Sequence, residues 1–132
     1  MKPIGDTLRL LESADTQERV FTHDYMVPLL PLLEHPHSLA ESELRQALSR
    51  VQTLSEHSAT NLLRSVVLCA FASESEYWAR LAAGWLEDGF PLDGALCQSA
   101  ATLSKSISQS TRHRAIRAAK QWERKHHEPG NV

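Results

Sequence analysis

The chain has 132 residues, of which 42% are hydrophobic and 23% are charged, and its formal net charge at pH 7 is −2. This length fits one domain that buries about two-thirds of the surface exposed by the unfolded chain, and the composition argues against intrinsic disorder. No run approaches the roughly 18 apolar residues of a membrane span, and the first residues lack the apolar stretch of a signal peptide, so we expect a cytoplasmic protein with no membrane contact.

Apolar residues recur with the period of a helix rather than that of a strand. From these stripes we expect helices over roughly residues 4–13, 17–34, 38–56, 58–72, 74–88, 92–107 and 110–127. The clearest stripe, at spacings of three and four, is formed by Leu92, Leu96, Ala100, Leu103 and Ile107. We therefore predict an all-α fold, organised as a single helical domain over residues 1–127 with a flexible C-terminal tail over residues 128–132.

In the first half of the chain, prolines and a capping pattern indicate where helices end and begin. Pro28 and Pro31 must kink or split the expected second helix, because proline lacks an amide hydrogen and clashes with the preceding turn. Pro36 ends that helix, since the residue before a proline is pushed out of the helical region. Ser38 followed by Glu41 has the spacing of a capping box, which predicts the start of the next helix.

The second half carries similar signals. Ser73 followed by Glu76 predicts a second capping box, and Asp93 and Ser110 are candidate N-caps for the last two helices. Gly89, just before Phe90-Pro91, predicts a helix stop, because glycine accepts the left-handed conformation and proline cannot continue a helix.

A pattern of Ser, Arg and Ala recurs along the chain and suggests an internal repeat. Shifted by 37 positions, the set Ser73, Arg80, Ala82 and Trp85 recurs as Ser110, Arg117, Ala119 and Trp122. Shifted by 35 positions, the set Ser38, Arg45 and Ala47 recurs as Ser73, Arg80 and Ala82. A helical hairpin of this length is typical of an α-solenoid repeat, and the alternative is an irregular helical bundle in which the matches are accidental.

Two segments resemble HEAT-type repeats. The segment Val27–Pro36, with prolines among leucines, looks like the first helix of such a repeat, and the segment His113–Ala119 is similar to the second helix. The resemblance implies a right-handed stack of antiparallel helical hairpins, about six or seven helices in all, with a curved binding surface. The chain departs from the family in the turn, where His35-Pro36-His37 stands in place of the usual Asp.

Charge is unevenly distributed. Residues 1–93 hold 7 Lys/Arg and 14 Asp/Glu, whereas residues 105–125 hold 7 Lys/Arg and a single acidic residue. At about 100° per residue, one side of the last expected helix carries a candidate basic binding face, formed by Arg114, Arg117, Lys120, Arg124 and Lys125. The opposite side is apolar and includes Ala115, Ala118, Ala119 and Trp122.

The basic face has three interpretations. It can be a solvated helix surface, with the C-terminal cations favoured by the helix dipole. It can dock an acidic protein partner, and the opposite charges would then steer the two proteins together. It can bind a nucleic-acid backbone, although the pI of about 6.4 argues against a dedicated nucleic-acid binder.

Two histidine-rich segments, residues 34–37 and 126–128, are the only metal-like clusters, and their spacing matches no zinc signature. The sequence also contains no glycine-rich phosphate loop, no Gly-x-Ser-x-Gly and no His-Glu-x-x-His. We therefore predict no metal, no cofactor and no catalytic residues, while a helical enzyme or metal protein built on dispersed residues stays an open alternative.

Taken together, these patterns predict a non-enzymatic protein–protein interaction module, such as an adaptor, inhibitor or immunity-type partner. It would bind through the groove of the helical repeats or through the basic last helix, with an acidic protein as partner and nucleic acid as the alternative. The segment Ile4–Leu11 is less polar than the terminal cap of a solenoid should be, so a homodimer also fits.

Overall fold

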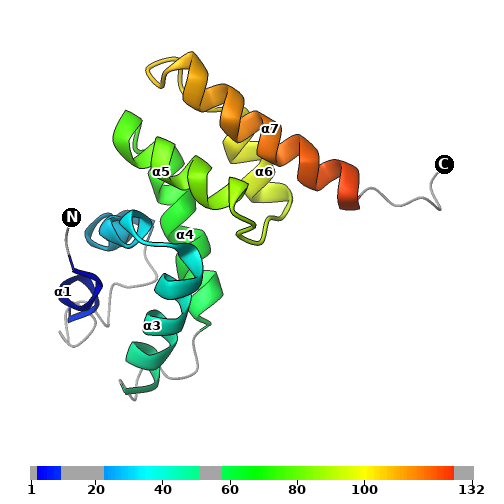
Figure 1. Ribbon diagram of the computed structural model, residues 1–132. Helices are drawn as coiled ribbons and strands as arrows, with labels where there is room; N and C mark the ends of the chain where they lie inside the picture. Colours follow the sequence, from blue (N-terminus) through cyan, green and yellow to red (C-terminus); the bar gives the residue numbers. More distant parts are fainter. Residues whose placement is uncertain (1–2, 10–22, 51–57, 127–132) are drawn as a thin grey trace.

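The computed structural model describes residues 3–9, 23–50 and 58–126, and in these residues every regular element is a helix. In chain order the elements are α1 (Ile4–Leu8), the 3-10 helix η2 (His23–Glu34), α3 (His37–Arg50), α4 (Ala59–Ala72), α5 (Glu76–Glu87), α6 (Gly94–Ala101) and α7 (Gln109–His126) (Figure 1). The predicted all-α class is confirmed. The predictions for residues 10–22, 51–57 and 127–132, including the C-terminal tail, lie outside the described residues. No helix in the described ranges is long and apolar enough to cross a membrane.

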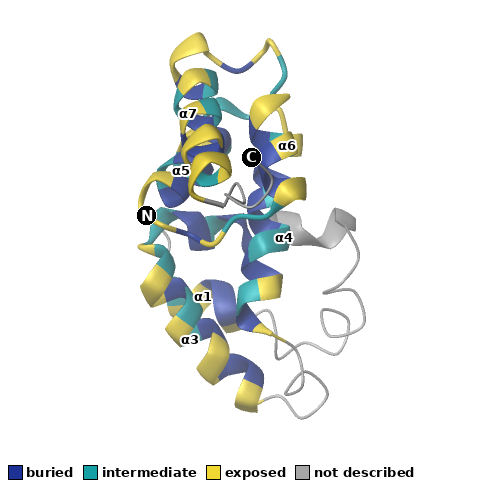
Figure 2. Cartoon of the chain, turned by 90° about the vertical axis from the view of Figure 1, so that its right-hand side faces the viewer, coloured by how far each residue is buried: buried dark blue, intermediate teal, exposed yellow. Residues whose placement is uncertain are grey.

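The helices pack in an alternating order. α4 packs on η2 and on α6, while α7 packs on α5 and α6. In Figure 2, α3, α5 and α7 follow one another along one side of the molecule, and α4 and α6 lie on the other side. One hydrophobic cluster draws buried side chains from all seven described elements and joins the two sides.

The segment with two prolines, η2, is a 3-10 helix along its whole length rather than a kinked α-helix. With three residues per turn, residues three apart lie in one column. Leu29 and Leu32 form one such column and Leu30 and Leu33 another, and all four side chains are at most 2% exposed. Pro31 lies between these columns and is half-buried. The three-residue spacing of the leucines suits this tighter helix, because it keeps each buried pair in one column.

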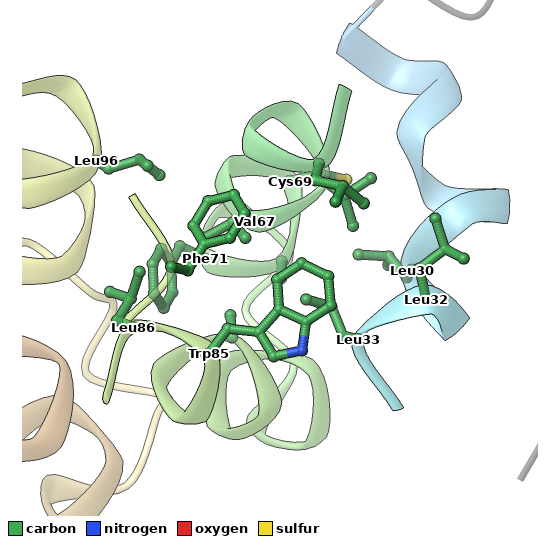
Figure 3. Close-up of a cluster of buried hydrophobic side chains, with 14 of the residues drawn as sticks. Leu30, Leu32, Leu33, Val67, Cys69, Phe71, Trp85, Leu86 and Leu96 are labelled. Atoms are coloured by element: carbon green, nitrogen blue, oxygen red, sulfur yellow. The ribbon is translucent and has the colours of Figure 1, made fainter. Parts of the chain in front are cut away.

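α4 is the central helix of the core. Its buried side chains include Leu63, Val66 and Val67, which are fully buried. Figure 3 shows Cys69 on the side of the η2 leucines, and Val67 and Phe71 on the side of α5. The helix begins after Ser58, whose side chain accepts a hydrogen bond from the Asn61 amide. Since α4 touches helices on both sides of the molecule, its burial couples the two halves of the fold.

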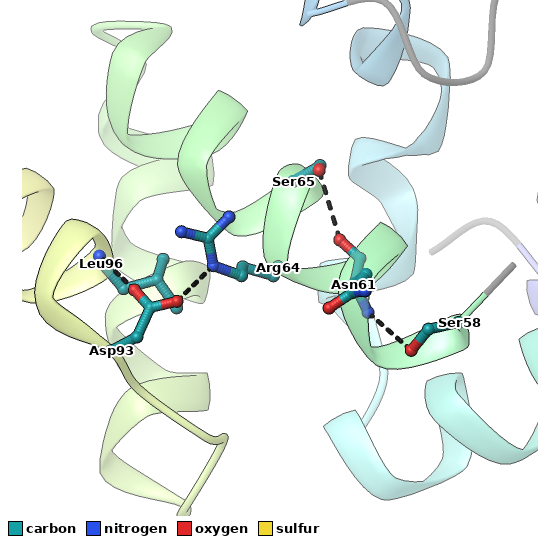
Figure 4. Close-up of polar contacts among 6 residues, drawn as sticks. All are labelled: Ser58, Asn61, Arg64, Ser65, Asp93 and Leu96. Atoms are coloured by element: carbon teal, nitrogen blue, oxygen red, sulfur yellow. Dashed lines mark hydrogen bonds and ion pairs between the residues drawn. The ribbon is translucent and has the colours of Figure 1, made fainter.

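Polar contacts fix α6 against α4. Asp93 caps α6 by accepting from the Leu96 amide at 2.9 Å, and its other oxygen pairs with Nε of Arg64 at 2.5 Å (Figure 4). The Arg64 hydrogen bond lowers the pKa of Asp93, so the carboxylate stays charged for both roles. The prediction of Asp93 as an N-cap is confirmed.

Two predicted capping boxes are wrong. Ser38 lies inside α3, and Glu41 instead accepts from the Thr60 hydroxyl and pairs with Arg45. The cap of α5 is Ser75, whose side chain accepts from the Trp78 amide, and Ser73 belongs to the end of α4. α4 ends at Ala72 and Ser75 caps α5, so the turn between the two helices is short. Within this turn Glu74 adopts a left-handed φ of 59°.

The predicted stop at Gly89 is confirmed, with a φ of 98° just after α5. The predicted helix over residues 92–107 is wrong in its second half, because α6 ends at Ala101. Beyond α6, serine side chains hydrogen-bond to backbone amides in place of helical carbonyls; for example, the Ser104 hydroxyl accepts from the Ser106 amide. Even so, Ile107 is 1% exposed and Leu103 packs against the core from this loop. The apolar stripe therefore marks burial correctly although the backbone is no longer helical.

Candidate binding surface on α7

The start of α7 is held by a carboxylate from α5. Glu76 accepts hydrogen bonds from the Ser108 amide at 2.6 Å, from the Ser108 hydroxyl at 3.0 Å and from the Thr111 hydroxyl at 2.6 Å. The Thr111 and Ser108 hydrogen bonds lower the pKa of Glu76. Ser108 also accepts from the Thr111 amide, whereas Ser110, the predicted cap, lies inside the first turn. This contact brings the N-terminal ends of α5 and α7 together.

Small side chains seat α7 on the rest of the protein. Ala115, Ala118 and Ala119 are at most 6% exposed, and the backbone carbonyl of Ala119 lies 3.9 Å from the Cys97 thiol of α6. Trp122 is half-buried against the core. The alanines allow the helix to approach its neighbours closely, so the orientation of its outer side is fixed by backbone packing.

Arg114 points back to α5 and not outward with the rest of the predicted basic face. Its Nη2 and Nε lie 2.6 Å and 3.1 Å from the Glu87 carboxylate, and the side chain is 32% exposed. The guanidinium lies over α5 beside Gly84, where an added Cβ would stand 3.7 Å from Nη2, at ordinary van der Waals contact. The pair lowers the pKa of Glu87 and fixes the rotation of α7 against α5.

Three of the five predicted cations lie together on the outer side of α7. Arg117, Lys120 and Arg124 are exposed, and at about 100° per residue they fall within roughly 60° of one another, opposite the buried alanines. We call these three residues the basic stripe. None of them forms an ion pair with any acidic residue in the part of the chain that the structure describes, although Arg117 is near enough to contribute to the lowered pKa of Glu87.

The fifth cation, Lys125, lies at the mouth of a cavity of about 350 Å³ between the end of α5 and α7. We call this cavity the α5–α7 pocket. Its lining is mixed: Phe90 and Ala118 are buried and Trp122 is half-buried on the apolar side, and Glu87, Gln121 and Lys125 are exposed on the polar side. The pocket therefore adjoins the basic stripe along the same helix.

A second cavity, of about 320 Å³, lies on the other side of the Arg114–Glu87 pair. It is bounded by the corner between η2 and α3 and by Arg80, Trp85 and Asp88 of α5 and its C-cap. Its arginines are opposed by Asp88 and by Glu87, which pairs with Arg114. This cavity has no excess of positive charge comparable to that of the basic stripe.

The histidines of the predicted metal-like segments 34–37 make structural contacts. His37 Nε2 hydrogen-bonds the Asp88 carbonyl at 3.0 Å, and its ring meets Trp85 and Phe90 edge-on. The carbonyl of His35 accepts from Trp85 Nε1 at 2.8 Å. Among the described residues, no three His, Cys, Asp or Glu side chains gather as metal ligands, and residues 127 and 128 of the second segment lie outside them.

Sequence reasoning missed the groups that shape this surface from α5. Glu76 and Glu87 reach α7 over separations of 27 to 35 residues, and Phe90 was read only as part of a helix stop. The sequence signal for these contacts is that α5 has an acidic residue at each end, Glu76 and Glu87, while α7 is predominantly basic. No protein-family model matches the chain, and no curated protein or solved structure matches it significantly.

Proposed function

We propose that the protein is a non-enzymatic protein–protein interaction module, of adaptor, inhibitor or immunity type, that binds an acidic partner through the basic stripe. The observation that carries this proposal is the alignment of Arg117, Lys120 and Arg124 on the outermost side of a helix whose inner side is rigidly seated. A row of cations on such a surface attracts an acidic surface and limits how it can dock.

The solvated-surface interpretation explains this arrangement less well. Cations near the C-terminus of a helix are favoured by its dipole, which accounts for Arg124 but not for Arg117 and Lys120 further from that end of α7. Like charges three or four residues apart weaken a helix by a few tenths of a kcal/mol per pair. The dipole therefore leaves Arg117 and Lys120 unexplained, and an external acidic partner would give the whole row a role.

We propose further that the helices form a HEAT-like α-solenoid, in which α7 is the last layer. The support is the packing of alternate helices, with η2 on α4, α4 on α6 and α5 on α7. The ties from Glu76 to Thr111 and from Glu87 to Arg114 indicate that α5 and α7 run side by side in the same direction, as equivalent helices of neighbouring repeats do. At the repeated positions, Arg80 and Arg117 are both exposed, while Ala82 and Ala119 are both buried.

The test compares two charge-reversed variants with the wild type. Arg117→Glu with Lys120→Glu reverses the stripe, and Arg50→Glu with Lys105→Glu makes the same change of net charge at exposed positions elsewhere. Each protein is immobilised and exposed to cell extract treated with nuclease, and the retained proteins are quantified by mass spectrometry. We expect at least one acidic protein to be retained by the wild type and by the control and to be lost from the stripe variant. Equal retention by both variants would refute the proposal.

Nucleic-acid binding through the same stripe is the second candidate, since exposed cations spaced along one helix also suit phosphates. Its signature is a steep salt dependence: three phosphate contacts should lose about 20- to 40-fold in affinity between about 50 and 200 mM salt. Anisotropy measurements with a labelled 20-nucleotide DNA over this range decide the matter. Binding to that probe with a steep salt slope, removed by reversal of the stripe, would replace the acidic-protein proposal.

A further inference from the structure

We propose that the α5–α7 pocket is the anchor site of the partner, and that it takes one large apolar side chain from an acidic segment of that protein. This inference rests on the proposed function, because the acidic residues of the same segment would lie on the basic stripe. It adds the chemistry of the partner: an aromatic or large aliphatic residue flanked on one side by carboxylates.

The composition of the pocket suits such an anchor. The inner wall consists of Phe90, Leu86 and Ala118, which are at most 6% exposed, and half-buried Trp122 and Leu92 extend the apolar surface toward solvent. Hot spots of protein interfaces are pockets of this kind, in which an aromatic or aliphatic side chain loses its contact with water. A volume of about 350 Å³ lies at the low end of the range for small-molecule sites, so it suits a side chain better than a cofactor.

The walls of the pocket are fixed by the same contacts that orient α7. Glu87, which lies at its edge, is held by Arg114, and Phe90 is held by the ring of Trp85, with centroids 5.4 Å apart, and by the edge of His37. The Phe90 amide also donates to the Trp85 carbonyl. A pocket whose walls are set before binding loses little entropy when it is filled.

The positive charges around the pocket indicate in which direction the partner's acidic segment extends from it. At the mouth, Gln121 and Lys125 lie one turn apart, and Arg117 and Arg124 of the stripe each lie one turn from Gln121. The acidic neighbour Glu87 is already paired with Arg114, so it adds little negative potential toward solvent. A segment with its apolar residue in the pocket can therefore extend its carboxylates over Lys125 toward the stripe.

The test begins with a random 12-residue peptide library displayed on phage and selected against the full chain at moderate salt. We expect the enriched peptides to share one aromatic or large aliphatic residue next to two or more acidic residues. An enriched peptide is then synthesised with a fluorescent label, and its Kd is measured for the wild type and three variants by anisotropy.

The variants separate the pocket from the stripe. Gln121→Trp fills the mouth of the pocket from an exposed position, and Gln98→Trp makes the same substitution at an exposed position of α6. Arg117→Glu with Lys120→Glu reverses the stripe. We expect Gln121→Trp to weaken the peptide by about 30-fold, as loss of an interface hot spot does, and Gln98→Trp to change its Kd by less than about threefold. Thermal unfolding and backbone amide spectra confirm that each variant is folded.

The outcomes distinguish this inference from the proposed function. Acidic peptides that bind Gln121→Trp as tightly as the wild type but lose affinity for the stripe variant would overturn the anchor and leave the acidic-partner proposal standing. Apolar peptides without acidic residues, unaffected by reversal of the stripe, would overturn both the inference and the proposed function. A selection that enriches no common peptide would also overturn both.

Discussion

Two helix interfaces of this protein are built in different ways. Where η2 meets α4, large aliphatic side chains such as Leu29, Leu32 and Val66 are fully buried. Where α7 meets α5 and α6, the buried residues of α7 include Ala115, Ala118 and Ala119, and carboxylates on α5 bind its hydroxyls and its guanidinium. The first interface depends mainly on apolar volume, and the second depends on close backbone approach and hydrogen-bond geometry.

This difference bears on the proposed function, because α7 carries the basic stripe and one wall of the α5–α7 pocket. Apolar burial itself is non-directional, whereas the bidentate Arg114–Glu87 pair and the Glu76 hydrogen bonds are directional. The directional contacts therefore hold α7, the helix whose outer side we propose binds the partner.

The largest effect should follow a loss of volume at the η2–α4 interface. Leu32→Ala removes a fully buried side chain from the core, and we expect the free energy of unfolding to fall by about 2–5 kcal/mol. Urea denaturation measures this change. Leu39→Ala at a side chain that is 42% exposed is the control and should cost much less. Similar losses for the two variants would show that η2 is not seated on α4 as described.

An addition of volume at the α7 interface should have the next largest effect. Ala119→Leu puts three extra carbons where the side chain is 1% exposed, and we expect a loss of about 1–3 kcal/mol because α7 must move away from its neighbours. Ala101→Leu, at an exposed position at the end of α6, is the matched control. If Ala119→Leu were as stable as this control, close packing of α7 would be disproved.

Acid should weaken the polar ties of α7 with a smaller effect. The folded protein lowers the pKa of Glu76 below its ordinary 4.5, so the unfolded chain binds the proton more tightly and stability falls as the pH drops below about 4.5. Glu76→Gln should cost about 1 kcal/mol at pH 7 and less at pH 3, because at pH 3 the unfolded chain already binds the proton and the advantage of the charged carboxylate is reduced.

Urea denaturation of the wild type and of Glu76→Gln at both pH values measures this difference. Glu74→Gln, at an exposed position of the preceding turn, serves as the control and should have little effect at either pH. An equal cost of Glu76→Gln at pH 7 and pH 3 would mean that the charge of Glu76 does not hold α7.

Much of the fold could be predicted from local signals. The period of apolar residues predicts α4, α5 and α7 within two residues of their observed bounds, and the local signals at Gly89 and Asp93 correctly mark the end of α5 and the start of α6. The end of α6 was missed because Leu103 and Ile107 continue the apolar stripe from a loop. Serines at alternate positions from Ser104 to Ser108 were the available signal, since their hydroxyls compete for helical hydrogen bonds.

The candidate site was predictable only in its outer part. Exposure of Arg117, Lys120 and Arg124 follows from helical geometry together with the alanines on the opposite side. The inward turn of Arg114 depends on Glu87, 27 residues earlier in the chain, and the pocket depends on where Phe90 returns after α5. Such contacts arise from the packing of distant elements, and no local pattern encodes them.

The leucine columns of η2 also determine which insertions and deletions in this segment keep its leucines buried. With three residues per turn, the loss or gain of one residue rotates everything beyond it by about 120° around the helix axis. A deletion between Leu29 and Leu32 would bring Pro31 or Glu34 into the place of a buried leucine, whereas the removal of three residues would return each column to its own side. Natural relatives of this chain should therefore differ in length here by multiples of three, while the loops of the protein are free of that rule.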